Sequence, residues 1–268
     1  GQLVVDTASD TSDGDTTSLS TLLANKGADG FVSLREAITA ANNTANGSLA
    51  DLISFGIAGT GVHTITLGSA LPSITDAVIL NASTDDSFAA NGSKPAVVLN
   101  GNSLNVAGLT LTSTADGSTI RGLVIKNFGQ ADILIQSGSS GNTIAGNYLG
   151  ALDSSGNYDA SIALNAYVVE IYGDNNIIGG TTSADRNVIV SNTANYGIFV
   201  NGAGAFNNRI IGNYIGTNAT GNTSIGASFT AASLFNSGAN NQIGGSAANE
   251  GNVLARTIYL FNPGSGSV

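Results

Sequence analysis

Few side chains in this sequence could transfer protons, and they are widely spaced. The chain has one histidine, no cysteine, and eight lysines and arginines in 268 residues. Asp85 and Asp86 form an adjacent acidic pair, but neighbours on a strand point to opposite faces. Their setting, NASTDDSFAANGSK, is typical of a solvated loop. His63, in GVHTITL, is interpreted as an outward strand residue. The sequence therefore leans against an enzyme and indicates no catalytic residue, while polysaccharide chemistry stays open as an alternative.

A second group of acids could bind a metal. The segment DTASDTSDGD, residues 6–15, places four aspartates close together: Asp6, Asp10, Asp13 and Asp15. Hard carboxylate oxygens suit calcium, although the segment lacks the glutamate that closes an EF-hand loop. A calcium site and a solvated acidic segment both remain open, and no other cofactor is predicted.

A tyrosine-containing motif occurs twice. NTIAGNYLG at 142–150 returns as NRIIGNYIG at 208–216. Asn147 and Asn213 are placed at a bend, because asparagine tolerates left-handed backbone, and stacked asparagines can form hydrogen-bonded ladders. We interpret the motif as a structural corner. The alternative is a row of aromatic contacts to a glycan, for which the candidates are Tyr148, Tyr214, Tyr172 and Tyr196.

The motif belongs to a longer repeat, since NNIIGG at 175–180 and NVIV at 187–190 also return, as NNQIGG at 240–245 and NVLA at 252–255. Short aliphatic runs bounded by Gly, Asn, Ser or Asp are typical of strands and turns, and they lie too close together for crossover helices. If each unit is three coils of about 22 residues, the chain stacks as a solenoid. The sequence therefore predicts an all-β fold, a single-stranded right-handed parallel β-helix of about ten coils over residues 53–268.

The N-terminal part differs from the repeats. SLREAITAANN at 33–43 predicts an α-helix, with Ser33 and Glu36 as a capping box and Leu34, Ala37, Ile38 and Ala41 on one apolar face. An open solenoid end exposes strand edges, so terminal coils need a cap. We expect residues 1–52 to form that cap, continuous with the β-helix as one domain.

Composition limits the partners. The formal net charge of −10 repels nucleic-acid phosphates, and no apolar run approaches the roughly 20 residues of a membrane-spanning helix. The chain opens on Gly1 and contains no methionine. We expect a monomeric piece of a longer chain.

Several segments of the sequence resemble a known family. FVSLREAITAANN, ISFGI with HTITLGSALPSIT, NNIIGGTTSADRNVIVSN and NRIIGNYIGTNATGNTSIG are similar to right-handed parallel β-helix repeat regions of large bacterial secreted and cell-surface proteins of the adhesin-like kind. The resemblance implies an extracellular or cell-surface location and a structural or adhesive role, with a polysaccharide or another cell-surface ligand as partner. Distant relatives with this fold cleave or epimerise acidic polysaccharides, but their Gly-His-Gly and Arg-x-Lys signatures are missing here.

Overall fold

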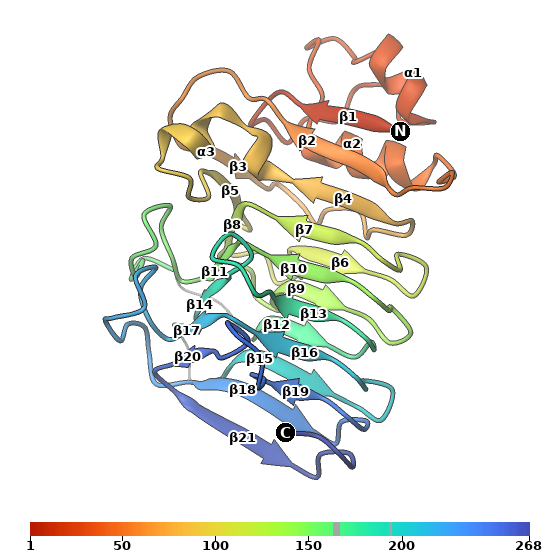
Figure 1. The fold of residues 1–268 in the computed structure, drawn as a ribbon. Helices are drawn as coiled ribbons and strands as arrows, with labels where there is room; N and C mark the ends of the chain where they lie inside the picture. Colours follow the sequence, from red (N-terminus) through yellow and green to blue (C-terminus); the bar gives the residue numbers. More distant parts are fainter. Residues whose placement is uncertain (163–166, 193–194) are drawn as a thin grey trace.

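The fold is a stack of parallel strands, as the sequence predicts. The computed structural model describes residues 1–162, 167–192 and 195–268. These residues form three sheets, and all pairing between their named strands is parallel (Figure 1). The chain visits the sheets in turn, and from the coil that starts at β4 onward each circuit adds one strand to each of them. This arrangement is a right-handed parallel β-helix.

The sheets are named A, B and C in the order in which the chain enters them. Sheet A contains β1 (Gln2–Val5), β2 (Asp51–Phe55), β4 (Val78–Asn81), β7 (Thr119–Arg121), β10 (Thr143–Ala145), β13 (Ile177–Gly179), β16 (Arg209–Ile211) and β19 (Gln242–Ile243). Sheet B contains β3 (His63–Thr66), β5 (Val97–Asn100), β8 (Leu123–Lys126), β11 (Tyr148–Gly150), β14 (Val188–Val190), β17 (Tyr214–Ile215) and β20 (Val253–Leu254). Sheet C contains β6 (Leu109–Leu111), β9 (Ala131–Ile135), β12 (Tyr167–Ile171), β15 (Tyr196–Asn201), β18 (Thr230–Phe235) and β21 (Thr257–Phe261).

The predicted coil length and coil number are wrong. Counted from the strands of sheet A after β1, the described residues make seven coils, starting at positions 51, 78, 119, 143, 177, 209 and 242. Even the shortest step, from 119 to 143, exceeds the predicted coil length, and the longest runs from 78 to 119. The motif that contains β10 returns at β16 with β13 between them, so the sequence repeat spans two coils.

The two coils of a repeat differ in where they carry their long loop. In the coil that starts at β10, two residues join sheet A to sheet B and a long segment follows β11. In the next coil, residues 180–187 lie between β13 and β14 and a short segment follows β14. Loops lie outside the apolar core and need not share a length, so coils of unequal size still stack.

The interior is filled by aliphatic side chains in register. One inward column of sheet A runs through Leu3, Ile53, Leu80, Ile120, Ile144, Ile178, Ile210 and Ile243. All of these side chains are buried except that of Ile243, which is partly buried. Burying each such side chain contributes about 1.5–3 kcal/mol. The core therefore continues without interruption along the stack.

Two asparagine ladders line the corners of the stack, which confirms the prediction that these residues stack. Before sheet A, each side-chain amide bonds to the next one along the stack: Asn142 to Asn176 at 2.8 Å, Asn176 to Asn208 at 3.0 Å and Asn208 to Asn241 at 3.0 Å. Before sheet B, Asn147 bonds to Asn187 at 3.1 Å, Asn187 to Asn213 at 3.0 Å and Asn213 to Asn252 at 3.1 Å in the same way. The predicted left-handed backbone at Asn147 and Asn213 is wrong, because the preceding Gly146 and Gly212 have that conformation, with φ of 68° and 69°.

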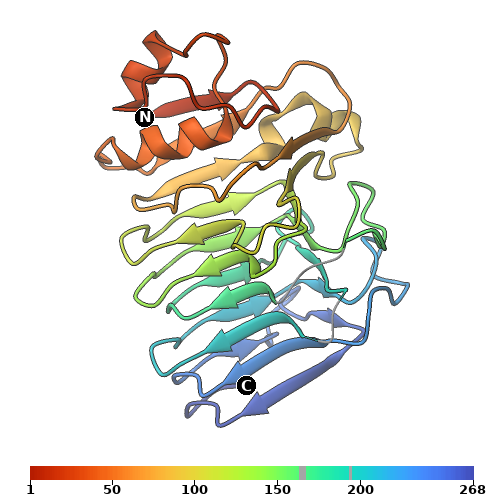
Figure 2. The ribbon, with the colours of Figure 1, turned by 180° about the vertical axis from the view of Figure 1, so that it is seen from behind.

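The predicted cap helix is confirmed. Helix α2 (Leu34–Asn42) begins after Ser33, whose hydroxyl accepts from the backbone N–H of Glu36, while the Glu36 carboxylate accepts from that of Ser33. It packs against β1 and β2 with its apolar face buried, and it lies at the N-terminal end of the stack (Figures 1 and 2).

Four elements of the first hundred residues are missing from the sequence interpretation. Strand β1 pairs with β2, so sheet A begins inside the cap region. Helix α1 (Leu19–Ala24) has a capping box built from Ser18 and Thr21 in place of a glutamate. The 3₁₀ helix η1 (Ala82–Thr84) and helix α3 (Asp86–Ala90) lie between β4 and β5, where a loop is expected.

Candidate functional site

The repeated tyrosines Tyr148 and Tyr214 lie in one outward row of sheet B, separated by Val188. Tyr148 is 7% exposed, and its burial, with a smaller contribution from Asp153, raises its pKa to about 12. Tyr148 also lines a small cavity of 150 Å³. The guanidinium of Arg186 lies over the ring of Tyr214, with its Cζ atom 4.2 Å from the ring centroid.

Each of these rings also packs against a glycine of the loop that follows it. A Cβ added at Gly156 would lie 3.1 Å from the ring of Tyr148, and one added at Gly221 would lie 2.6 Å from that of Tyr214. The two tyrosines anchor equivalent loops, which is the geometry of a structural corner. Their role as glycan contacts stays a prediction.

Of the other two candidates, Tyr196 lies on β15 of sheet C, and Tyr172 lies directly after β12 of the same sheet. The Tyr172 hydroxyl donates to Oε1 of Glu170 at 2.6 Å. Burial and this bond raise the pKa of Tyr172 to about 12, and burial raises that of Glu170. The ring of Tyr196 lies 5.9 Å from that of Tyr167 and 4.7 Å from that of Phe199.

Tyr196 belongs to an aromatic ladder along sheet C that the sequence analysis missed. Its ring pairs have centroids 4.7 to 6.4 Å apart, and its members are Tyr167, Tyr196, Phe199, Phe235, Tyr259 and Phe261. Ring faces within the ladder are turned toward one another, whereas a sugar stacks on an open face. The ladder therefore stabilises neighbouring coils. The tripeptide Leu-Phe-Asn, present at 234–236 and 260–262, is the sequence signal for it.

The four candidate calcium ligands have separate protein partners. Asp6 accepts from Lys26, and Asp13 from the backbone N–H of Ala28, each through a carboxylate oxygen. Asp15 accepts from Thr17, and those bonds lower its pKa. These contacts hold the turns of the cap and direct the carboxylates to different places.

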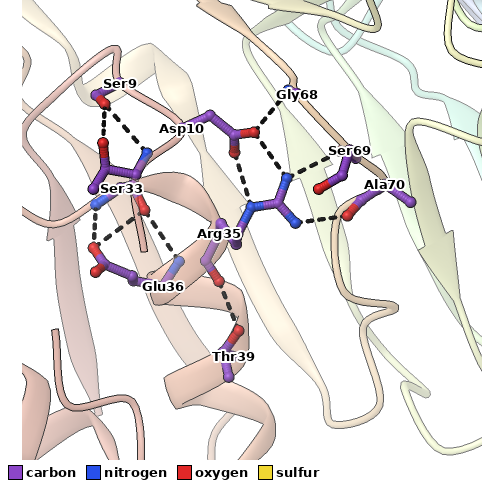
Figure 3. A network of polar contacts seen from close by, with 10 residues as sticks. Ser9, Asp10, Ser33, Arg35, Glu36, Thr39, Gly68, Ser69 and Ala70 are labelled. Carbon is purple, nitrogen blue, oxygen red and sulfur yellow. Dashed lines mark hydrogen bonds and ion pairs between the residues drawn. The ribbon is translucent and has the colours of Figure 1, made fainter. Parts of the chain in front are cut away.

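Asp10 has the largest network of the four. Its two oxygens accept from Nε and Nη2 of Arg35 at 3.0 and 2.9 Å, and one also accepts from the N–H of Gly68 at 3.0 Å (Figure 3). Arg35 in turn donates to the carbonyls of Ser69 and Ala70. Asp10 thus ties α2 to the first coil. Whether calcium binds this segment stays a prediction.

His63, which the sequence analysis treats separately from the acidic pair, meets Asp85 and Asp86 at the start of α3. The ligand atoms of His63, Asp85 and Asp86 lie within 4.8 Å of one another. The expectation of a solvated loop is wrong for Asp85, whose side chain is buried and accepts from Ile57 and Ser87. Nε2 of His63 lies 2.8 Å from the carbonyl oxygen of Gly59 and 3.7 Å from Asp85. Asp85 therefore caps α3 and joins it to Ile57 in the segment that follows β2.

The outer face of sheet A carries a hollow beside the loop that follows β13. Its volume is 310 Å³, and its lining includes Thr143, Ile177, Gly179, Thr181, Asp185 and Arg209. An oxygen of Asp185 lies 3.6 Å from Arg121, and Arg209 forms an ion pair with Glu250. The hollow therefore combines aliphatic walls with hydroxyl, carboxylate and guanidinium groups.

Asp185 and Glu250 occupy matching places in the two repeats. Thr182 donates its hydroxyl to Asp185 at 2.6 Å, and Ala247 donates its N–H to Glu250 at 3.1 Å. Each acid thus holds the residue three positions before it, so the two acids cap equivalent turns. The hollow itself has no signal in the sequence, because it lies between coils.

Within the described part of the chain, the helices are too short or too polar to cross a membrane. No protein-family model matches the sequence, and a search of curated proteins finds no significant match.

Proposed function

We propose that the chain is a non-catalytic structural or adhesive β-helix segment of a larger secreted or cell-surface bacterial protein. The observation that carries this proposal is the pair of buried asparagine ladders, which run beside a continuous aliphatic core. From the coil that starts at β7 onward, each coil is joined to the next by backbone, amide and apolar contacts at once. Such a stack forms a stiff body whose stability accumulates from neighbouring interfaces.

The groups most suited to proton transfer have structural partners, which supports the non-catalytic part of the proposal. Asp85 caps a helix, Asp10 holds Arg35, and His63 bonds a carbonyl oxygen. The location outside the cell rests on the resemblance to exported β-helix proteins.

The experiment has two parts. Small-angle scattering should show a rigid rod whose dimensions stay constant between low and high salt. Incubation with pectin, alginate and other polyuronides, with and without calcium, should release neither unsaturated nor reducing ends. Release of such ends, lost on substitution of a described acid, would overturn the non-catalytic part.

Glycan binding is the second candidate function. The hollow on sheet A favours it, because a cavity with both aliphatic and polar walls suits a sugar ring.

A further inference from the structure

The hollow on sheet A occupies a place that an arginine fills in the next repeat. Thr143 and Arg209 are equivalent positions at the start of β10 and β16, in successive copies of the repeat. Arg209 extends toward the following coil, where it donates to Gln242 and pairs with Glu250. Thr143 is too short to reach the equivalent acid, Asp185. The space in front of Asp185 is therefore open.

The hollow does not require a cation, although an arginine fills the equivalent space. Asp185 already has Arg121 at 3.6 Å, supplied by a coil two turns earlier. Arg209 is paired with Glu250 on the other side. A positively charged ligand would lie between two guanidinium groups whose charges are already balanced. The electrostatics favour a neutral ligand that both donates and accepts hydrogen bonds.

The walls have the chemistry of a sugar site. Ile177 and Ile211 offer aliphatic surface for the C–H groups of a pyranose ring. Asp185 accepts hydrogen bonds from hydroxyls, Arg209 donates them, and Thr181 does both. A volume of 310 Å³ lies at the lower end of small-molecule sites. It fits one ring, with the rest of a glycan outside.

We propose that this hollow binds a single neutral pyranose unit of a glycan, with Asp185 and Arg209 as its polar contacts. The inference rests on the adhesive part of the proposed function and names its ligand class. One shallow subsite gives weak affinity, with a Kd of about 1 mM. Adhesion then depends on several arms or several sugars acting together.

The test is an NMR titration of the ¹⁵N-labelled chain with D-glucose, D-galactose and N-acetyl-D-glucosamine, each added alone. We expect saturable shifts for at least one sugar, centred on Thr143, Thr181 and Asp185. Thr143→Arg copies the next repeat and should abolish them. The matched control, Ile79→Arg, lies in the same outward row two strands away and should leave them unchanged.

Asp185→Asn provides a second variant if Thr143→Arg does not fold. It keeps an oxygen for Thr182 but removes the charge, so the affinity should fall about tenfold. Absence of saturable shifts with all three sugars, or shifts that persist in Thr143→Arg, would overturn the site. Binding of arginine amide in place of the sugars would overturn the ligand class. None of these results alters the scattering or polyuronide measurements, so the two proposals fail separately.

Discussion

Asn176 donates from Nδ2 to Oδ1 of Asn208 at 3.0 Å, and both side chains are buried in successive coils. Oδ1 of Asn176 accepts in turn from the backbone and the side chain of Asn142. Each amide therefore satisfies polar groups of two coils. The ladder couples neighbouring coils because an unsatisfied amide is costly inside the stack.

Asn176→Ala should lower the free energy of unfolding by about 3 kcal/mol or more, since it leaves buried donors and an acceptor unpaired. The matched control is Asn207→Gly. Asn207 lies next to the buried ladder in the same corner, but its side chain is exposed; it has a φ of 55° and donates to Asn175. Glycine keeps that backbone, so its cost should stay below about 1 kcal/mol. Urea unfolding would compare the two, and equal losses would contradict a role for burial.

Gly221→Ala should destabilise the chain more than Gly117→Ala. Both glycines have left-handed backbone, with φ of 73° and 76°, but an added Cβ meets the Tyr214 ring only at Gly221 of this pair. Left-handed strain costs roughly 1–2 kcal/mol at either site, and overpacking adds about 1 kcal/mol or more at Gly221. In a Tyr214→Ala background the difference should disappear, as thermal unfolding would measure.

Arg35→Met should destabilise the N-terminal cap by about 2–3 kcal/mol. The side chains of Arg35 and Asp10 are 14% and 13% exposed, so the substitution leaves a largely buried carboxylate without its cation. Lys26→Met removes a more exposed pair with Asp6 and should cost less than about 1 kcal/mol. Hydrogen exchange should show loss of protection at α2 in the first variant. Equal protection in both would refute this assignment.

Calcium should leave the melting temperature of the wild-type chain unchanged, because Asp6, Asp10, Asp13 and Asp15 are already bound by separate protein groups. A ligand at 100 times its Kd would stabilise the fold by about 2.7 kcal/mol. Melting curves in EDTA and in excess calcium would detect that change. A rise that Asp13→Asn removes would establish a site in this segment.

Glu170 should make the chain less stable as pH rises above 4.5. Burial raises the pKa of Glu170 above its ordinary value of 4.5, so the folded chain retains a proton that the unfolded chain releases. The linkage then lowers the free energy of unfolding as pH rises through this interval. Glu170→Gln should flatten the pH dependence of urea midpoints there. A variant with the same slope as the wild type would argue against Glu170 as its source.

The sequence by itself determined the features that depend on neighbouring residues. Ser33 and Glu36 lie three positions apart and cap α2 whatever lies around them. Short aliphatic runs between glycines and asparagines gave parallel strands with turns. The repeated Asn147 and Asn213 identified the corner and two members of its ladder, because repeated units place equivalent side chains in one column; the Asn187 between them comes from the intervening coil.

The tertiary structure alone decided coil length and the contacts between coils. A repeat as long as this one divides equally well into two or three coils by strand pattern, and the choice depends on loops that bury little apolar surface. Loops of this kind leave no periodic signal. The same reason hid Asp185 beside Arg121, Asp85 beside His63, and the hollow in front of Thr143. Each arises where distant segments are brought together by the stacking of the core.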